Sequence, residues 1–311
     1  MNHLADKYNI CVITLPFVDQ IGAKILSKFI DILEPLSNEL FVIAGKFPDR
    51  PNKRIHIIRI KSDEKKELTL IRAIKYIFKQ LRTTYNLIKI SKNVDIVIFF
   101  IGTRIDTLPI LISKLLRKKT VLVATGSSSK VVERDNGRLF GFSKIVFPFI
   151  FRILEHINFH LADKIAVESE SITDFMGLKK YRNKITIGAM HVNTYLYKIK
   201  KDLKDKRNLI GFISRLSPHK GVTNFTKAIP LILKERDDLE FLIGTIGPLF
   251  NEIKSELKNN GLYDKVELTG WIPIENFVDY LNELKLLVFP SYTEGLPNIV
   301  LEAMACGTPV L

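Results

Sequence analysis

The chain reads Leu286-Leu-Val-Phe289 and then Pro290-Ser-Tyr-Thr-Glu294-Gly-Leu-Pro-Asn-Ile-Val-Leu-Glu302-Ala-Met-Ala-Cys-Gly-Thr-Pro309, and this stretch decides the fold. The first four residues are apolar, as in a buried strand, and residues 298–305 have the spacing of a helix. Glu294 is therefore expected in a strand-to-helix loop and Glu302 in the helix behind it. Ligands of open α/β sheets bind beyond the carboxyl ends of the strands, so the two carboxylates mark a candidate ligand site.

The same alternation of short apolar runs and longer amphipathic stretches continues through the chain. It predicts one series of strands at residues 10–15, 40–44, 55–60, 94–101, 120–124, 164–167 and 184–187, and a second at 209–214, 240–244, 266–268 and 286–289. Helical spacing is found at residues 23–36, 68–90, 221–234 and 251–260. Strands that alternate with helices indicate an α/β protein with parallel sheets.

A run of charged residues, Lys198 to Arg207, separates the two series and has little apolar content. We interpret it as a connector. The predicted domains are then an N-terminal domain at residues 1–197, a linker at 198–207 and a C-terminal domain at 208–311. The length of 311 residues agrees with two domains, because domains usually contain about 100–150 residues.

The loop Ser214-Arg215-Leu-Ser-Pro-His-Lys220-Gly221 is a second candidate site, since it follows a predicted strand and precedes a predicted helix. A guanidinium can bind two phosphate oxygens at once, an ammonium supplies a point charge, and helix N-terminal amides favour anions. Arg215 and Lys220 are thus candidates for holding a diphosphate. The alternative is that both are ordinary solvent-facing loop cations.

Composition limits the partners and the compartment. The formal net charge of +14 favours anionic partners. No nucleic-acid-binding motif is found, so phosphorylated substrates and an anionic membrane surface are preferred and nucleic acid is not expected. Cys11 and Cys306 lie in apolar segments far apart in sequence, and the first residues do not resemble a secretory signal. We expect a cytoplasmic protein, with peripheral association at the inner face of the membrane as an open alternative.

Residues 65–92 are predicted to form an amphipathic helix. Apolar residues share one face and basic residues line its flank: Leu70, Ile71, Ile74, Ile77, Phe78, Leu81, Tyr85 and Ile88, with Arg72, Lys75, Lys79, Arg82 and Lys89. Such a helix suits an anionic membrane surface. The competing interpretation is a helix that buries its apolar side on the sheet.

The segment around Glu294 and Glu302 closely resembles the signature of family 4 of the retaining nucleotide-sugar glycosyltransferases, in which seven residues separate two glutamates. The neighbouring Pro-Ser, Glu-Gly and Glu-Ala-Met-Ala-Cys-Gly-Thr-Pro-Val strengthen the match. The resemblance implies an α/β protein of the GT-B fold, with two doubly wound, Rossmann-like domains that face each other across a cleft. The family pattern continues beyond the position of Leu311, so we expect an incomplete second domain.

The resemblance also implies roles for individual residues. Arg215 and Lys220 would grip the diphosphate of a nucleotide-diphosphate sugar, Glu294 would hold hydroxyls of the transferred sugar and Glu302 would hold the ribose hydroxyls. The other residues expected on the donor side are Gly22, Gly247, Gly270, Trp271, Ile272, Gly295, Leu296, Asn298 and Ile299. Without the family pattern, Glu302 would be an ordinary helix residue and Trp271 a packing residue.

The acceptor side departs from the family. Many members have a His near the reacting sugar, where this chain has Thr125, Gly126 and Ser127. These residues would supply hydroxyl or amide hydrogen bonds instead, although a Ser-rich loop also suits a flexible connector.

The function implied is the retaining transfer of a sugar to a sugar or lipid-linked acceptor, with Glu294, Arg215 and Lys220 as catalytic residues. No Asp-x-Asp motif occurs in the sequence, so neither a catalytic metal nor a cofactor is expected. The alternatives are a nucleotide-sugar epimerase or a phosphorylase on the same architecture, and a non-catalytic subunit that binds a nucleotide sugar.

Overall fold

The chain divides into two compact units, unit 1 (Met1–Gly188) and unit 2 (Ala189–Leu311), in a computed structural model. The structure describes residues 7–14, 20–45, 47–48, 50–60, 69–101, 103, 105–124, 143–188, 192–292, 294 and 296–311. Each unit contains one parallel sheet, which confirms the prediction of an α/β protein with two parallel sheets.

Unit 1 is built on a seven-stranded parallel sheet in the order β3-β2-β1-β4-β5-β6-β7. Its strands are β1 (Tyr8–Ile13), β2 (Ser37–Ala44), β3 (Ile55–Arg59), β4 (Ile96–Phe99), β5 (Lys119–Ala124), β6 (Lys164–Val167) and β7 (Ile185–Ile187). The central strand β1 pairs on one side with β2, where Ile10 lies opposite Leu40, and on the other with β4, where Ile10 lies opposite Ile96.

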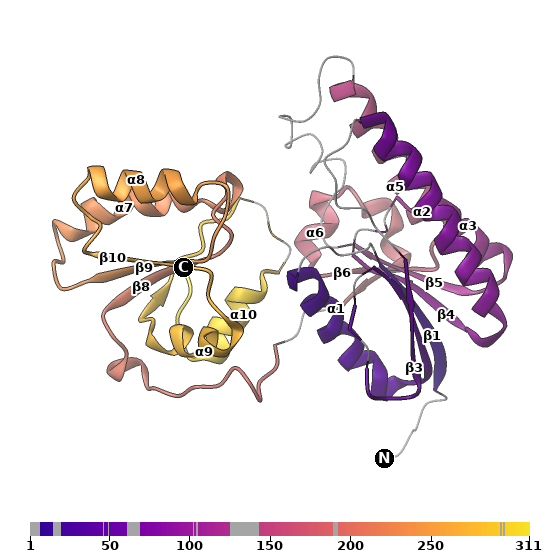
Figure 1. The fold of residues 1–311 in the computed structure, drawn as a ribbon, viewed down its shortest axis with the longest axis horizontal. Coiled ribbons are helices and arrows are strands. Elements are labelled where there is room, and N and C mark those ends of the chain that lie inside the picture. Colours follow the sequence, from indigo (N-terminus) through magenta and orange to yellow (C-terminus); the bar gives the residue numbers. More distant parts are fainter. Residues whose placement is uncertain are drawn as a thin grey trace. The chain divides into compact units, whose positions relative to one another are not determined.

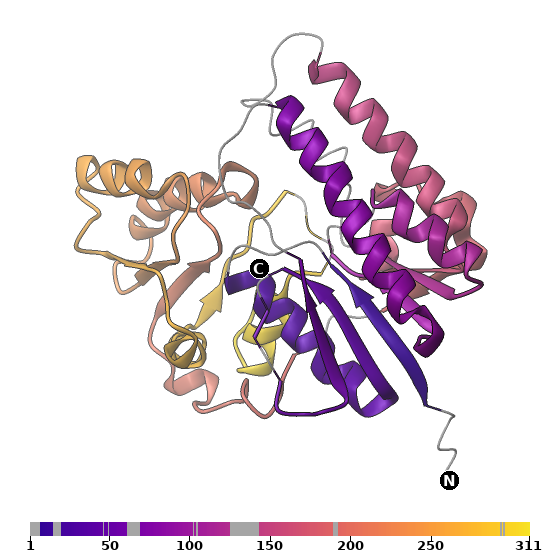
Figure 2. The same ribbon diagram turned by 45° about the vertical axis from the view of Figure 1, so that its right-hand side comes forward.

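Helices cover both faces of this sheet (Figure 1). They are α1 (Gln20–Leu33), α2 (Thr69–Ile90), α3 (Thr107–Leu115), α5 (Ser143–Leu161) and α6 (Glu170–Phe175). On one face, Leu26 and Ile30 of α1 pack with the apolar residues of β1 and β2. On the other face, residues of the remaining helices, among them Ile110 of α3 and Phe159 of α5, join a second cluster. Figure 2 shows α2, α3 and α5 running close together on that face.

Unit 2 repeats the plan with four strands in the order β10-β9-β8-β11. The strands are β8 (Leu209–Ile213), β9 (Glu240–Gly244), β10 (Val266–Gly270) and β11 (Leu286–Leu287), and the helices are α7 (Val222–Leu233), α8 (Phe250–Asn259), α9 (Ile274–Glu283) and α10 (Asn298–Ala305). Phe225 of α7 and Ile253 of α8 share one buried cluster, whereas Leu281 of α9 and Ala303 of α10 belong to another. The two helix pairs therefore cover opposite faces of the sheet (Figure 1).

The charged segment 198–207 lies within unit 2, whereas the sequence predicts a connector there. The ammonium of Lys206 is buried and donates to Thr308 Oγ1 over 2.6 Å and to the Cys306 carbonyl over 3.0 Å. The backbone N–H of Lys200 donates to Asn282 Oδ1 over 2.7 Å. Polar contacts with α9 and with the end of α10 thus hold a segment that has few apolar residues of its own.

Asp163 joins β6 to β5 and α3 in unit 1. Its carboxylate accepts hydrogen bonds from Lys114 Nζ over 2.6 Å and from the N–H and hydroxyl of Thr120 over 2.8 and 2.9 Å. Burial acts to raise the pKa of Asp163, but the hydrogen bonds from Lys114 and Thr120 outweigh burial and hold the pKa below its usual value.

Candidate functional site

The candidate site of unit 2 lies where the order of the strands reverses. From β8 the chain continues to β9 and β10 on one side, whereas β11 pairs with the other side of β8. Such a switch point is where open α/β sheets bind ligands beyond the carboxyl ends of their strands. The loop after β8 carries Arg215 and Lys220, and the loop after β11 carries Glu294. Both candidate loops therefore follow strands that are neighbours in the sheet.

Side chains of these two loops meet at Glu294. The ammonium of Lys220 forms an ion pair with Glu294 Oε1, and the hydroxyl of Ser291 donates to the same oxygen over 2.7 Å. The Lys220 ammonium also lies 5.6 Å from the ring centroid of Phe289, within the range of a cation–π contact. The side chains of Lys220 and Glu294 are 20% and 23% exposed, so both can still be reached from solvent.

The backbones of the two loops are also in close contact. Gly221, with φ +76°, follows the short turn Pro218–Lys220 and precedes α7. A Cβ at this glycine would overlap the Pro290 carbonyl oxygen and would lie 3.0 Å from the Pro290 carbonyl carbon. The N–H of Tyr292 donates to the His219 carbonyl over 3.0 Å. These contacts fix the distance between the loop that carries Lys220 and the loop that carries Glu294.

The carboxyl ends of β9 and β10 support the loop after β8. Thr245 has φ +82°, which is rare for a β-branched residue, and its hydroxyl donates to the Ser214 carbonyl over 2.5 Å. Its N–H donates to the Gly270 carbonyl over 2.8 Å. Gly247 lies directly against the same loop, because a Cβ there would be only 2.7 Å from the carbonyl carbon of Leu216. Gly247 is thus placed beside the predicted phosphate loop.

Arg215 is exposed, and within the described part of the chain its guanidinium has neither a hydrogen bond nor an ion pair. Asn298 and Ile299 begin α10. Glu302 is 8% exposed in the same helix, where Tyr197 hydrogen-bonds it. Burial first, and then the charge of Glu302, raise the pKa of Tyr197.

Other predicted donor-side residues are spread over unit 2 and unit 1. Trp271 follows β10 and is 46% exposed, whereas Ile272 is a buried core residue. Gly22, which the resemblance places on the donor side, lies inside α1 of unit 1, because this helix begins at Gln20. The acceptor-side Thr125, Gly126 and Ser127, and Gly295 of the donor side, lie outside the described residues.

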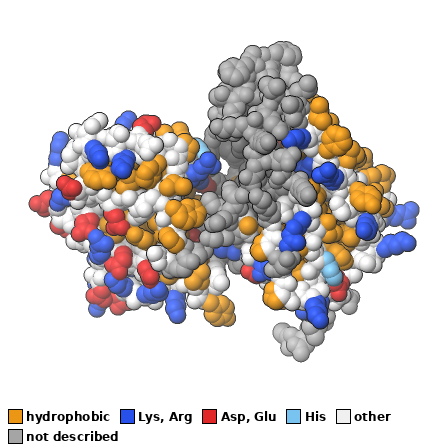
Figure 3. All heavy atoms as spheres, in the orientation of Figure 1, with side chains coloured by type: hydrophobic (Ala, Val, Ile, Leu, Met, Phe, Trp, Pro, Cys, Tyr) orange, Lys and Arg blue, Asp and Glu red, His pale blue; other side chains and the backbone are white. Residues whose placement is uncertain are grey.

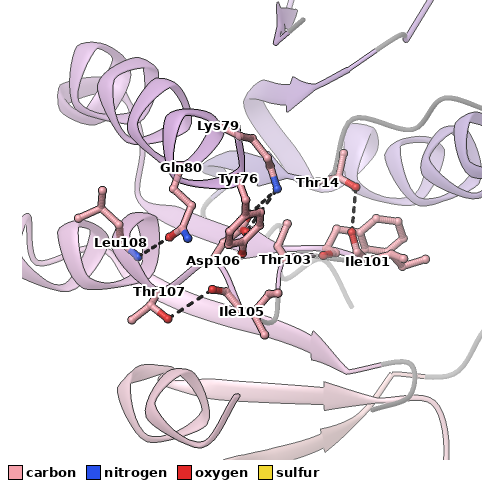
Figure 4. Close-up of polar contacts among 11 residues, drawn as sticks. Thr14, Tyr76, Lys79, Gln80, Ile101, Thr103, Ile105, Asp106, Thr107 and Leu108 are labelled. Carbon is pink, nitrogen blue, oxygen red and sulfur yellow. Dashed lines mark hydrogen bonds and ion pairs between the residues drawn. The ribbon is translucent and has the colours of Figure 1, made fainter. Parts of the chain in front are cut away.

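Unit 1 contains a buried polar cluster at the carboxyl end of β4 (Figure 4). Asp106, which precedes α3, is fully buried; it accepts a hydrogen bond from the Tyr76 hydroxyl and forms an ion pair of 3.0 Å with Lys79. Burial lowers the pKa of Lys79, and the charge of Asp106 opposes this decrease. Gln80 Oε1 accepts from the N–H of Leu108 over 3.0 Å. Side chains of α2 thus satisfy polar groups at the start of α3.

These contacts determine which side of α2 faces the protein. Lys79, expected on the flank of the helix, points inward to Asp106, and the inner side also buries Thr83, Thr84 and Leu87. The outer side exposes large apolar residues: Ile74, Ile77, Phe78, Leu81, Tyr85 and Ile88. The apolar side of α2 is therefore not buried on the sheet. Figure 3 shows hydrophobic side chains interspersed with Lys and Arg along this side of unit 1.

Two features are absent from the part of the chain that the structure describes. None of the helices there has the length and apolarity needed to cross a membrane. No group of three or more His, Cys, Asp or Glu side chains in that part of the chain could hold a metal ion.

Comparison with solved structures defines the fold. The chain is similar to Anabaena Alr3699/HepE in its complex with UDP-glucose, with a TM-score of 0.66 and 17% identity over 96% of this chain and 79% of that chain. Two parallel sheets of this order, matched over nearly the whole chain, define the GT-B fold.

Residues 196–311 match the family model of the glycosyl transferases group 1. The chain is 32% identical over 108 residues to the phosphatidylinositol N-acetylglucosaminyltransferase GPI3 subunit of Saccharomyces cerevisiae. The matched segment covers 35% of this chain and 24% of the relative. The chain is also 26% identical over 210 residues to the amylovoran biosynthesis glycosyltransferase AmsK of Erwinia amylovora. That matched segment covers 64% of this chain and 47% of the relative. The chain thus spans less than half the length of these two curated relatives.

Two residues of the site are not among those predicted from the sequence. Ser291 lies three positions before Glu294 and contacts its carboxylate. A polar residue so near a candidate carboxylate in a predicted loop could have been selected from the sequence as a site residue. Thr245 gives no such signal, because its unusual backbone conformation and its contact with Ser214 depend on three neighbouring strands.

Proposed function

We propose that this chain transfers a sugar, with retention of configuration, from a nucleotide-diphosphate donor to an acceptor. The observation that carries the proposal is the meeting of Lys220, Ser291 and Glu294 at the switch point of the unit 2 sheet. We assign the donor to unit 2 and the acceptor to unit 1. A UDP-sugar is the proposed donor, supported by the UDP-glucose complex of the structural neighbour and by the family of residues 196–311.

In the proposed site the cations hold the diphosphate and the carboxylates hold hydroxyls. Lys220 and the exposed Arg215 neutralise the phosphate oxygens, and Lys220 keeps Glu294 as a second partner through its three N–H donors. Glu294 accepts hydrogen bonds from the transferred sugar, and Glu302 accepts them from the ribose. The first turn of α10, with the backbone N–H groups of Asn298 and Ile299, adds a positive dipole end.

The reaction proceeds on one face of the sugar. The bond between C1 of the sugar and the phosphate oxygen breaks, and a bond between C1 and the acceptor oxygen forms on the same face. The proton of the acceptor hydroxyl passes to the leaving phosphate. Because negative charge grows on that phosphate, fixed cations at Arg215 and Lys220 stabilise the transition state.

Titration calorimetry with UDP tests the phosphate role of Lys220. A charge-assisted hydrogen bond contributes about 1.5–3 kcal/mol, so Lys220→Met should lower the affinity for UDP by about 10- to 100-fold. The matched control is Lys227→Met, since Lys227 is an exposed lysine on α7. Equal affinities of the two variants, or no binding of UDP by the wild type, would overturn the donor site proposed here.

We further propose that the acceptor is a lipid-linked molecule reached at an anionic membrane surface, on the cytoplasmic side. The outward-facing apolar side of α2 supports this, together with exposed apolar residues on the neighbouring helices, Leu111 and Leu115 of α3 and Phe149, Ile150, Ile153 and Ile157 of α5. Arg82 and Lys89 of α2 and Arg152 of α5 are exposed beside them and would attract an anionic leaflet.

Sedimentation with vesicles tests this second proposal. The wild type should sediment with vesicles that contain phosphatidylglycerol and much less with phosphatidylcholine alone. Phe78→Glu should abolish sedimentation, because it places a charge at a side chain that is 60% exposed on α2. Leu231→Glu in unit 2, where the side chain is 63% exposed, is the matched control and should sediment like the wild type. Sedimentation of Phe78→Glu at the wild-type level would refute the proposal.

A further inference from the structure

We propose that Ser291 is a positioning residue, whose hydroxyl holds Glu294 by Oε1 so that Oε2 stays available for the hydroxyls of the transferred sugar. The inference rests on the proposed function, because it concerns how Glu294 meets the donor sugar. It adds a side chain and an assignment of the two carboxylate oxygens to that site.

The contacts of Glu294 are unequally divided between its two oxygens. Both the Lys220 ammonium and the Ser291 hydroxyl contact Oε1. In the described part of the chain Oε2 has no hydrogen-bond or ion-pair partner. An ionised carboxylate has about four sites for accepting hydrogen bonds. Oε2 can therefore accept from two ligand hydroxyls without losing either existing contact.

Ser291 is itself fixed by the backbone around it. Its N–H donates to the Phe289 carbonyl over 2.8 Å in the turn after β11. Its Oγ lies 2.7 Å from Glu294 Oε1 and 3.3 Å from the His219 carbonyl oxygen. A hydroxyl has one hydrogen to donate, and the shorter contact to a charged acceptor is the stronger of the two. The hydroxyl is thus committed to Glu294.

Ser291 has a role that Lys220 fills only in part once a diphosphate is bound. Lys220 then shares its three N–H donors between the phosphate oxygens and Glu294, so its hold on Glu294 is weaker than without the diphosphate. The hydroxyl of Ser291 is neutral and belongs to the same loop as Glu294, so its contact is unaffected by the phosphate. Ser291 therefore keeps the carboxylate in place when the sugar is present.

The experiment compares dissociation constants for UDP and UDP-glucose, measured by titration calorimetry on the whole chain. Ser291→Ala should weaken UDP-glucose binding by about 5- to 10-fold, toward the lower limit for a hydrogen bond to a charged group because Lys220 remains. It should change UDP binding less than about twofold, since UDP lacks the sugar. Ser291→Thr, which keeps the hydroxyl, should restore UDP-glucose binding.

Ser91→Ala is the matched control, because Ser91 of unit 1 donates a hydrogen bond of the same length, 2.7 Å, to the Ile88 carbonyl. It should bind both ligands like the wild type. Equal weakening of UDP and UDP-glucose binding in Ser291→Ala, or no weakening of either, overturns the positioning role. A wild type that binds neither ligand instead overturns the proposed function, so the two failures can be told apart.

Discussion

Replacing Gly221 with alanine should destabilise unit 2 by about 2–5 kcal/mol, of which about 1–2 comes from backbone conformation and about 1–3 from overpacking. The conformational part follows from φ +76°, a left-handed value that disfavours a Cβ. The steric part follows from Pro290, whose carbonyl carbon and Cγ would lie 3.0 and 3.1 Å from the new methyl group. Because the nearest obstacle is a backbone carbonyl group, the loop after β11 has to move.

Gly261→Ala separates the two contributions. Gly261 has φ +67° with no atom within 4 Å of a built Cβ, so its replacement carries the conformational cost alone. Trp271, the only tryptophan, lies in unit 2, so its fluorescence during urea unfolding reports on this unit. Gly221→Ala should lose about 1–3 kcal/mol more than Gly261→Ala. Equal losses would refute the close contact between the two loops, and the affinity for UDP should fall only in Gly221→Ala.

Three further changes test other parts of the structure. Asp106→Asn leaves the Lys79 ammonium, whose side chain is only 12% exposed, without its counter-charge. The free energy of unfolding of unit 1, measured in urea, should fall by about 3–5 kcal/mol. The double variant with Lys79→Met should recover most of this loss. Asp163 has a lowered pKa in the folded state, so its stabilisation is complete above the unfolded pKa of about 3.9 and is lost as the pH falls through the folded value. When the pH is lowered from 5 to about 2, Asp163→Asn should therefore lose less stability than the wild type. Circular dichroism measures this loss for both proteins. Gly247→Ala places a Cβ 2.5 Å from the backbone nitrogen of Leu216. It should destabilise unit 2 by about 1–3 kcal/mol, measured by fluorescence during urea unfolding. An unchanged midpoint of urea unfolding would contradict this contact.

The strands of both sheets could be predicted because buried parallel strands are continuous apolar runs. β6 (Lys164–Val167) and β9 (Glu240–Gly244) have the predicted limits. The helices α3 and α9 are among those that were not predicted from the sequence. α3 is short, is apolar on several sides and has Pro109 in its first turn, and α9 is also short and follows Pro273. Short helices next to prolines give little periodicity against which to recognise them.

Periodicity identified the two sides of α2 but did not indicate which one faces the sheet. The inner side depends on Asp106, because a buried carboxylate needs the ammonium of Lys79 and the hydroxyl of Tyr76. Neither partner is close to Asp106 in sequence. The pairing of Lys220 with Glu294 could not be predicted from the sequence either, because it requires β11 to lie beside β8. Lys79, Lys220 and Glu294 could be selected from the sequence, whereas Asp106 was not among the predicted residues, and in both pairs the partner is set by topology.

The position of β11 has a consequence for how the protein is made. β11 pairs with β8, although three helices and two strands separate them along the chain. During synthesis β8, β9 and β10 can associate as they emerge from the ribosome. The opposite edge of β8 stays unpaired until residues 286–287, which form β11, have emerged. Pairings between distant segments form slowly, and an exposed strand edge can associate with other nascent chains. The yield of soluble protein should therefore increase when chaperones protect that edge until β11 has emerged, and the proposed nucleotide site is completed only at this late step.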